Sequence, residues 1–559
     1  MEVLQIALTL AILLVLVVPV GKYIYKIISG EKSFVDPCMD RVDGFIFKIS
    51  GIKKDSMNWK QYSVALLLTN LIMTLMVFVI LLIQGLNLLN PNGIKGMDLS
   101  LAFNTAISFI TNTNLQHYSG EAGLSYLSQM AAITFLMFTS AASGFSAAAA
   151  FIRGITGSEK GLGNFYVDFV RLTTRILLAL SIITSIALIW QGVPQTLSSN
   201  ETIKTIEGTL QNIALGPVAS LESIKHIGTN GGGFFGANAA HPFENPTPIT
   251  NLIHILSMMI LPSSLVYSFG LMLKNKKQAW VIFGAMALLF MIALPTIFLS
   301  ESAGNPALDN AGLSQAAGNM EGKEVRFGIA QSSLFTTVTT AFTTGSVNTM
   351  HDSLTPIGGM IAMGQMMLNV VFGGKGVGLM NMLMYAILTV FLCGLMVGRT
   401  PEFLGKKIEG REIKLIAIAI LVHPFIILLP SAISLVAPAG VAGITNPGFH
   451  GISQVLYEFT SSAANNGSGF EGLLDNSVFW NVSTGLVMLL GRYTSIVALL
   501  AVAGSMQNKK AVPVTVGTLK TDTYLFTFVL VAVVLIVGAL TFFPSVALGP
   551  ISEYLTQLT

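Results

Sequence analysis

The sequence predicts an all-α polytopic membrane protein with ten transmembrane helices and four internal repeats. Of the 559 residues, 52% are hydrophobic and only 10% are charged, and the mean hydropathy is +0.71. Soluble domains carry about 25% charged residues, so this composition indicates a chain that lies in a bilayer with short loops. The net charge is only +3, which argues against a nucleic-acid partner. The positive charge instead indicates the orientation of the chain in the membrane.

Ten apolar stretches have the length that a helix needs to cross a bilayer. They are Met1–Tyr23, Val64–Leu88, Leu127–Phe151, Leu172–Trp190, Leu252–Leu273, Ala279–Leu299, Gly358–Val397, Leu415–Val436, Val478–Gly504 and Leu525–Ala547. We interpret the first stretch as a membrane span and not as a cleaved signal, because Glu2 stands where a signal has positive charge and Lys22 and Lys26 follow the apolar run.

Lysine and arginine gather in alternate loops, which predicts the orientation of the chain. The basic segments are Lys22–Lys60, Arg153–Arg175, Lys274–Lys277, Arg399–Lys414 and Lys509–Lys520. By the positive-inside rule these loops face the cytoplasm. With ten crossings, both termini then lie outside the cell.

The seventh apolar stretch is interrupted by VFGGKGVGLM, Val371–Met380, which carries four glycines and Lys375. Two full crossings here would force the basic loop Arg399–Lys414 to the outside. We therefore expect a single crossing by a broken helix, with Gly373–Gly378 as non-helical backbone. Such backbone is tolerated at membrane depth only inside protein or beside a water-filled cavity.

A polar and glycine-containing motif recurs in four of the outer loops: FITNTNLQ, GTNGGGFF, FTTGSVNT and AANNGSGF. Aligned on Thr113, Gly231, Gly345 and Gly467, the copies are 118 (231−113), 114 (345−231) and 122 (467−345) residues apart. Nine residues before each aligned position stands a polar residue in a weakly apolar segment: Asn104, Glu222, Thr336 and Glu458. Each repeat therefore reads as span, short pore helix, loop and span.

The repeats divide the chain into 62–168, 169–277, 278–411 and 412–510, with an N-terminal segment 1–61 and a C-terminal segment 511–559. Glycine and small polar residues usually mark simple outer turns, but four copies in step favour a common function.

Four such loops around one axis would suit the selection of a dehydrated monovalent cation, most simply K⁺. Replacing its hydration shell takes several oxygens, which backbone carbonyls can supply, and glycine allows the backbone angles that turn carbonyls to one side. The four cores contain no carboxylate, which argues against a divalent-selective ring of acids. The predicted filter residues are Asn112, Thr113, Asn114, Thr229, Asn230, Gly231, Gly232, Thr343, Thr344, Gly345, Ser346, Asn465, Asn466, Gly467 and Ser468.

Three long segments carry a resemblance to a known family: Thr111–Glu121, His226–Pro248 and Met396–Ile408. They resemble the potassium-transporting ATPase A chain, the ion-binding subunit of the bacterial Kdp complex, which is related to the Trk/Ktr potassium transporters. The resemblance implies a pseudo-fourfold ring of the four repeats, with one extra helix at each end, in the bacterial inner membrane.

The resemblance also implies partners: a P-type ATPase chain that hydrolyses ATP, a single-span C subunit and a very small extra subunit. K⁺ would be the transported substrate, entering from outside and leaving sideways through a tunnel to the ATPase chain, and no cofactor is implied. The sequence itself has neither a DKTG phosphorylation motif nor a G-x-x-x-x-G-K-[ST] loop, so we expect no catalytic site on this chain.

Charged and polar residues near the filter give further hypotheses. Lys375 would place an ammonium below the filter as a gate, or would snorkel to the inner surface. Arg399 and Arg492 would shape the tunnel, or would only anchor helices as basic residues commonly do.

Gln116 would contact the entering ion or brace the first loop. Glu222 and Glu458 are expected to stabilise their pore helices more than to bind ions.

Two alternative functions remain at this point. One is a self-contained Trk/Ktr-like channel or symporter, which would conduct K⁺ without ATP or partners. The other is an intramembrane hydrolase, which needs a nucleophile or metal constellation. His226 and His241 flank the second loop, but no H-E-x-x-H or comparable metal-ligand spacing occurs.

Overall fold

The computed structural model describes residues 2–86, 89–157, 161–398, 400–510, 512 and 519–558. Within these ranges, ten helices are long and apolar enough to cross a membrane. The prediction of an all-α polytopic fold with ten spans is confirmed. Arg399 lies outside the described residues.

Seven of the described spans are single helices, and three are built from consecutive helical segments that include a π-helical turn. Their bounds are α1 Glu2–Ser29, α3 Trp59–Ile83, α7 Phe135–Thr156 preceded by α6 Tyr126–Ser128 and η2 Gln129–Thr134, α8 Phe165–Leu172 continued by η3 Thr173–Leu178 and α9 Ala179–Trp190, α11 Pro248–Met272, α12 Lys276–Ser302, α16 Val377–Met396, α17 Gly410–Ser434, α20 Val478–Gln507, and α21 Tyr524–Val546 continued by η6 Ala547–Ile551 and α22 Ser552–Leu558.

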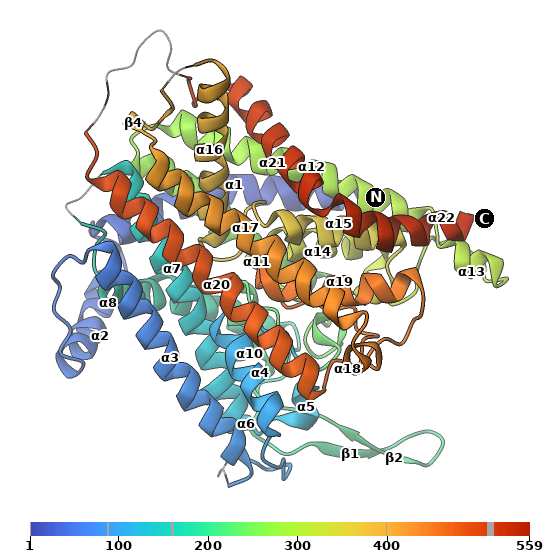
Figure 1. Ribbon diagram of the computed structural model, residues 1–559. Helices are drawn as coiled ribbons and strands as arrows, with labels where there is room; N and C mark the ends of the chain where they lie inside the picture. Colours follow the sequence, from blue (N-terminus) through green and yellow to red (C-terminus); the bar gives the residue numbers. More distant parts are fainter. Residues whose placement is uncertain are drawn as a thin grey trace.

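Four shorter buried helices stand between pairs of spans: α4 Leu99–Ile110, α10 Val218–Ile227, α14 Gly328–Ala341 and α19 Phe449–Ala464. The remaining elements are α2 Asp36–Ile49, η1 Gln84–Leu86, α5 Gly120–Gly123, η4 Asn238–Ala240, α13 Pro306–Asn310, η5 His351–Ser353, α15 Pro356–Leu368, α18 Pro438–Val441, and the strands β1 Glu201–Lys204, β2 Leu210–Ile213, β3 Glu402–Phe403 and β4 Lys406–Lys407. The antiparallel β1–β2 hairpin projects from the helical body (Figure 1).

The order of elements repeats four times as span, short helix, loop and span. The first repeat runs from α3 through α4 to α7, and the second from α8 through α10 to α11. The third runs from α12 through α14 to α15 and α16, and the fourth from α17 through α19 to α20. The extra helices stand outside this series, with α1 packed on α11 and α21 packed on α12.

Burial separates helices that line the centre from helices that face lipid. In the spans Tyr126–Thr156 and Pro248–Met272, 89% of the most apolar window is buried, against 22% in Val3–Ser29. The first of these spans is rich in Ala, Ser and Gly, whose small side chains let neighbouring backbones approach closely in a membrane. The core therefore combines buried polar and small residues around the four loops with a large cluster of buried apolar side chains, while further apolar side chains are exposed on the outer helices.

The third repeat contains the expected break. Helix α15 ends at Leu368, Asn369 adopts a left-handed φ of 48°, and α16 begins at Val377. The prediction of a broken helix is confirmed, but its bounds were wrong at both ends: the non-helical backbone is 369–376, and Gly378 is already helical. Gly378 packs directly against Gly373 with no room for a side chain, so the glycine there serves close packing and not chain reversal.

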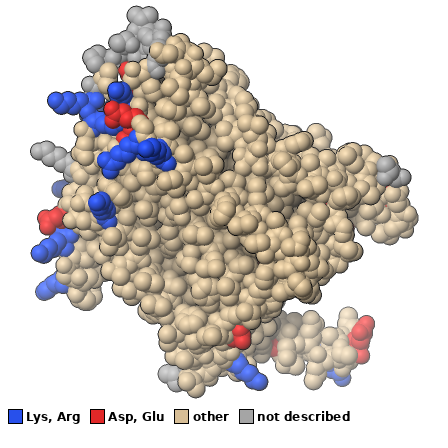
Figure 2. Space-filling view, viewed as in Figure 1, with Lys and Arg blue, Asp and Glu red and all other residues tan. Residues whose placement is uncertain are grey.

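Positively charged side chains gather at one end of the molecule. On the face shown in Figure 2, most lysine and arginine side chains gather along the left edge. The N and C termini lie toward the opposite side in Figure 1. The basic loops and the two termini therefore occupy opposite ends of the helical bundle.

Candidate functional site

Each of the four motif loops begins where one of the short buried helices ends. The loops follow α4, α10, α14 and α19 directly, so each helix presents its C-terminal carbonyl end to the loop behind it. The polar residues expected within these helices, Asn104, Glu222, Thr336 and Glu458, all lie there and are all buried. The C-terminal end of a helix carries a partial negative charge, which favours a cation at the loops.

The four loops share one backbone path. In each loop one backbone N–H donates to the carbonyl five residues earlier, at 2.7–3.0 Å, and the residue before it has a left-handed φ of 48–64°. The donors are Thr113, Asn230, Thr344 and Asn466, and the left-handed residues are Asn112, Thr229, Thr343 and Asn465. A positive φ is rare for threonine because of its branched Cβ, and such strain persists where the surrounding structure imposes it.

This shared path corrects the alignment of the first loop by one residue. The sequence alignment placed Thr113 opposite Gly231, Gly345 and Gly467, but the backbone pattern places Asn114 there. Asn114 has a left-handed φ of 59°, as Gly345 and Gly467 have positive φ values of 86° and 106°. Asparagine tolerates this conformation better than other residues with a side chain, which explains how it replaces glycine. The first spacing becomes 117 (231−114) residues.

Carbonyl oxygens from the first, third and fourth loops converge beside Gly231 of the second loop. A side chain on Gly231 would place its Cβ 3.0 Å from the carbonyl oxygens of Thr113, Thr344 and Asn466 at once. Gly345 likewise lies against the Asn466 carbonyl, and Gly467 against the Thr113 carbonyl. One point at the centre is therefore surrounded by backbone oxygens from separate repeats.

Side chains of the loops close the ring by bonding to the neighbouring loop. The four contacts are Asn112 Nδ2 to the Thr229 carbonyl at 2.7 Å, His226 Nε2 to Ser346 Oγ at 3.0 Å, Asn466 Nδ2 to the Thr339 carbonyl at 2.8 Å, and Asn465 Nδ2 to Thr113 Oγ1 at 3.0 Å. Each pair of adjacent repeats is thus tied together. These three amides and one imidazole connect the repeats, while backbone carbonyls face the centre.

An outer cavity of about 300 Å³ opens above the loops. Asn114, Gly231, Gly345 and Gly467 form its floor, and Glu471 and Asp475 stand in its wall. Burial raises the pKa of Glu471 to about 8 and that of Asp475 to about 7. The wall therefore gains negative charge as the pH rises through the neutral range.

Gln116 lies at the rim of this cavity and links two loops. Its Nε2 donates to the Gly233 carbonyl at 3.1 Å, and its Oε1 accepts from the Gly233 N–H at 2.8 Å. Both ends of the amide are occupied, so the structure shows Gln116 as a brace between the first and second loops.

A buried charge cluster supports the second loop from behind. Lys225 Nζ donates to Glu244 Oε2 at 2.8 Å and to both carboxylate oxygens of Glu222 at 3.2 Å. Glu244 in turn accepts the backbone N–H of Phe235 at 2.8 Å. Glu222 thus holds a lysine of its own helix and does not face the centre. Sequence reasoning did not single out Lys225, which belongs to no motif, or Glu244, although Glu244 lies in the family segment His226–Pro248.

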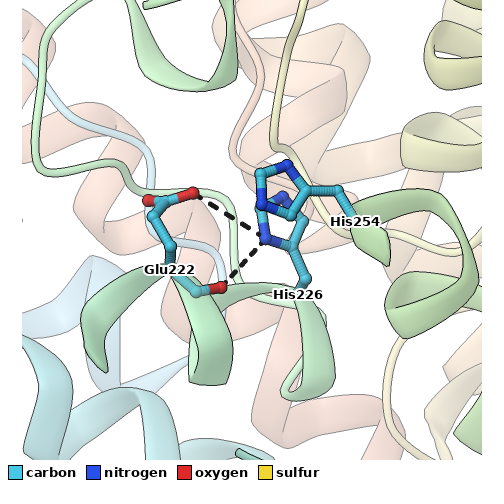
Figure 3. A group of neighbouring side chains, drawn as sticks. All are labelled: Glu222, His226 and His254. Atoms are coloured by element: carbon cyan, nitrogen blue, oxygen red, sulfur yellow. Dashed lines mark hydrogen bonds and ion pairs between the residues drawn. The ribbon is translucent and has the colours of Figure 1, made fainter. Parts of the chain in front are cut away.

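Two histidines stack beside this cluster, as Figure 3 shows. The rings of His226 and His254 are 3.9 Å apart and inclined by 11°. His226 Nδ1 contacts the Glu222 carbonyl at 2.9 Å and lies 3.8 Å from its carboxylate. Ring lone pairs lie in the ring plane, so two parallel stacked rings cannot direct them to one metal ion. Of the two, His226 links the second repeat to the third loop through Ser346.

Two cationic side chains are buried on the other side of the loops. The Lys375 backbone N–H donates to Thr229 Oγ1 at 3.2 Å, and its Nζ has no hydrogen-bond partner among the residues that the structure describes. The Arg492 guanidinium donates to the Ser140 carbonyl at 3.2 Å. The backbone carbonyl of Lys375 and the guanidinium of Arg492 both lie close to Gly144 of α7. Lys375 does not snorkel to the surface, since it is 1% exposed.

A second, smaller cavity of about 50 Å³ lies beside the helix break. Its wall includes Asn369 of the break, Asn465 of the fourth loop, and Asn381, His423 and Ser495. Side chains of α21 complete the lining. The lining of this small space is thus a mixture of polar and apolar side chains from the helix break, the fourth loop and α21.

The chain is similar over nearly its whole length to known potassium-transport proteins. A family model described as the potassium-transporting ATPase A subunit matches residues 7–555. The chain is 64% identical over 557 residues to the potassium-transporting ATPase potassium-binding subunit of Clostridium acetobutylicum, with 100% of both chains covered. It is 57% identical over 553 residues to the subunit of the same name from Geobacillus kaustophilus, with 99% of both covered. The crystal structure of the potassium transporter TrkH from Vibrio parahaemolyticus is similar with a TM-score of 0.49 and 16% identity, over 76% of this chain and 84% of that one.

Proposed function

Because the chain belongs to the potassium-transporting ATPase A subunit family, we propose that it is the K⁺-binding and translocating subunit of an ATP-driven uptake complex. Its four loops bind K⁺ from the outside after the ion sheds its water, and the ion then passes to a P-type ATPase subunit. One observation carries this proposal: the carbonyl oxygens of Thr113, Thr344 and Asn466 meet at one point beside Gly231.

The chemistry of that point suits a weakly hydrated monovalent cation. Neutral carbonyl oxygens replace water without adding the full charge that a divalent ion needs. The loops themselves contain no carboxylate, and the helix ends behind them supply only partial negative charge. The braces between neighbouring loops keep the same oxygens together around the centre, and both selection by cavity size and selection by the number and field strength of the carbonyl dipoles depend on that.

The outer cavity provides the entrance. The carboxyl groups of Glu471 and Asp475 raise the local concentration of cations above the loops. Gln116 keeps the first and second loops in register through its two hydrogen bonds to Gly233. Its effect on K⁺ affinity therefore comes from position and not from direct coordination.

The buried ammonium of Lys375 closes the direct way to the cytoplasm. It lies next to Thr229 on the inner side of the second loop, where it repels an ion that has passed the filter. At an effective dielectric constant of 20, the repulsion between two unit charges is about 2–4 kcal/mol at separations of about 4–8 Å. Arg492 adds positive charge on the same side. The ion is left with the small cavity between Asn369 and α21, which in this proposal is the start of the sideways exit.

The remaining partners follow from the family. A subunit of a potassium-transporting ATPase needs a catalytic chain, because this sequence lacks a phosphorylation motif and a nucleotide-binding loop. We include a single-span C subunit and a very small extra subunit in the complex. The chain lies in the bacterial cell membrane with the basic loops inside and both termini outside, as the distribution of charge in Figure 2 supports.

The decisive experiment is to locate the ion. We expect the complex, soaked with Tl⁺ or Rb⁺ and examined by anomalous diffraction, to show a peak beside Gly231 between the carbonyls of Thr113, Thr344 and Asn466. A map in which protein atoms fill this centre and no anomalous peak is present would refute the proposed filter. Liposomes containing this chain alone should not take up K⁺. Uptake without ATP and without partner subunits would favour the alternative of a self-contained channel or symporter.

A further inference from the structure

Three potential metal ligands meet in the wall of the outer cavity, outside the four loops. His117 follows the first loop, Glu458 lies in α19, and Asp475 follows the fourth loop. His117 Nε2 is 3.3 Å from Glu458 Oε1 and 3.7 Å from Asp475 Oδ2. One ligand atom from each residue lies within 4.8 Å of the other two. The group thus offers one imidazole nitrogen and two carboxylate oxygens to a common point.

The orientation of the imidazole is fixed by Asn481. His117 Nδ1 lies 2.7 Å from Asn481 Oδ1, and Asn481 Nδ2 donates to Ser100 Oγ and Asn476 Oδ1 at 3.1 and 3.2 Å. Because the amide nitrogen is used elsewhere, Oδ1 must accept and Nδ1 must carry the hydrogen. In the neutral ring the lone pair of Nε2 then points at the two carboxylates. Histidines that bind metals are held in the same way by an acceptor at the other nitrogen.

The charge of the group is not balanced by a permanent cation. Within the described ranges, neither Glu458 nor Asp475 pairs with a lysine or an arginine, and His117 is the basic partner of both. With both carboxylates ionised and the imidazole neutral, the state in which the group can bind a metal, its formal charge is −2. A buried charge of this size needs a counter-charge, which a proton on His117 balances only in part and a divalent cation balances fully.

We propose that His117, Glu458 and Asp475 form a binding site for a divalent cation of the zinc class. Zinc takes nitrogen and carboxylate oxygen at about 2.0–2.2 Å, so tetrahedral ligands lie roughly 3.4 Å apart, close to the two distances observed. His117 and Asp475 both line the outer cavity, which leaves a fourth position open to water. The site lies in the wall of the cavity that we propose as the potassium entrance, but it uses none of the loop carbonyls, so zinc binding can be measured independently of that proposal.

A second histidine with two carboxylates provides a control from the same side of the molecule. His450 Nε2 contacts Asp352 Oδ1 at 3.0 Å, and its Nδ1 contacts Glu553 Oε1 at 2.8 Å. Here the carboxylates stand at opposite edges of the ring and cannot share one ion. The same residue types are therefore present without convergent geometry.

Zinc binding tests the proposal directly. The purified complex in detergent at pH 8 and excess K⁺ is titrated with Zn²⁺ by calorimetry, and bound metal is counted by mass spectrometry. We expect the wild type to bind one more Zn²⁺ than Asp475→Asn or His117→Gln. Loss of a ligand should weaken binding by more than about 100-fold, since loss of a group that only orients a ligand already costs about 10–100-fold. His450→Gln should bind as the wild type does.

Asp475→Asn keeps the size of a partly exposed side chain, so it tests the site even if His117→Gln disturbs folding. Binding should also strengthen with pH, because Zn²⁺ displaces a proton from its ligands. Equal stoichiometry and affinity in the wild type and in both site variants would overturn the proposal. So would an equal loss in His450→Gln, which would indicate an indirect effect.

Discussion

The substitution Gly231→Ala tests the filter at its centre. The added methyl group would stand 3.0 Å from the three carbonyl oxygens that converge there. Non-bonded carbon contacts are most favourable at about 3.5–4.0 Å, so each oxygen would have to retreat by about 0.5 Å or the methyl would take the place of the ion. Gly231 has no positive φ, and the effect therefore comes from occupied space and not from backbone strain.

The expected loss follows from the number of contacts. An interaction between a charged group and a hydrogen-bonding group contributes about 1.5–3 kcal/mol. If two of the three carbonyls no longer contact the ion, the free energy of K⁺ binding becomes less favourable by about 3–6 kcal/mol. At 1.4 kcal/mol for each factor of ten, the dissociation constant for K⁺ rises about 100- to 10,000-fold.

The assay is the K⁺ concentration that half-activates ATP hydrolysis by the reconstituted complex, with calorimetric K⁺ binding as a direct check. Gly364→Ala is the matched control, because Gly364 lies in α15 and a Cβ there would meet no atom within 4 Å. The control should behave as the wild type. A Gly231→Ala complex with K⁺ affinity within threefold of the wild type would refute the central site, as would an equal loss in the control.

Three further predictions concern the surroundings of the filter. Lys375→Ala should raise the passive K⁺ leak of proteoliposomes at least about tenfold by removing the repulsion estimated above; a tight, fully coupled complex would exclude the gate. Gln116→Arg should lower the apparent K⁺ affinity by breaking two hydrogen bonds to the second loop and adding a cation at the entrance; unchanged affinity would contradict this. Burial lowers the pKa of His450, but hydrogen bonds to Asp352 and Glu553 outweigh it and raise the pKa to about 10. This value is above the usual 6.5, so the contact stabilises fully below pH 6.5 and is lost as the pH rises to 10. Amide exchange of α22 should accelerate over that range, and His450→Gln should remove the dependence; exchange with no pH response beyond the chemical rate would refute it.

The spans were predictable because lipid imposes a simple rule. A helix that crosses a bilayer needs about 20 apolar residues, and each of the ten expected stretches contains or overlaps one observed helical span. The broken helix was predictable for the same reason: the glycine-rich run with Lys375 could not lie in lipid. Its exact bounds were not predictable, because Asn369 ends α15 through a left-handed conformation that asparagine adopts in some contexts only.

The repeat of the loops was readable from spacing, but their register was not. Asn114 occupies the place of a glycine and is preceded by Thr113, so matching residue types shifted the first copy by one position. Contacts between repeats could not be predicted from the sequence either. His117 and Glu458 are 341 residues apart in the sequence, and only the ring arrangement brings them together. Lys225 and Glu244 likewise pair across a loop whose path the sequence does not reveal.

The covalent linkage of the four quarters affects how this protein can evolve. In a channel made of four identical chains, a mutation changes every quarter at once. Here a mutation alters one quarter and leaves three intact, so selectivity can drift in small steps. The differing braces, an amide at Asn112 and a histidine at His226, are what such independent drift would leave behind.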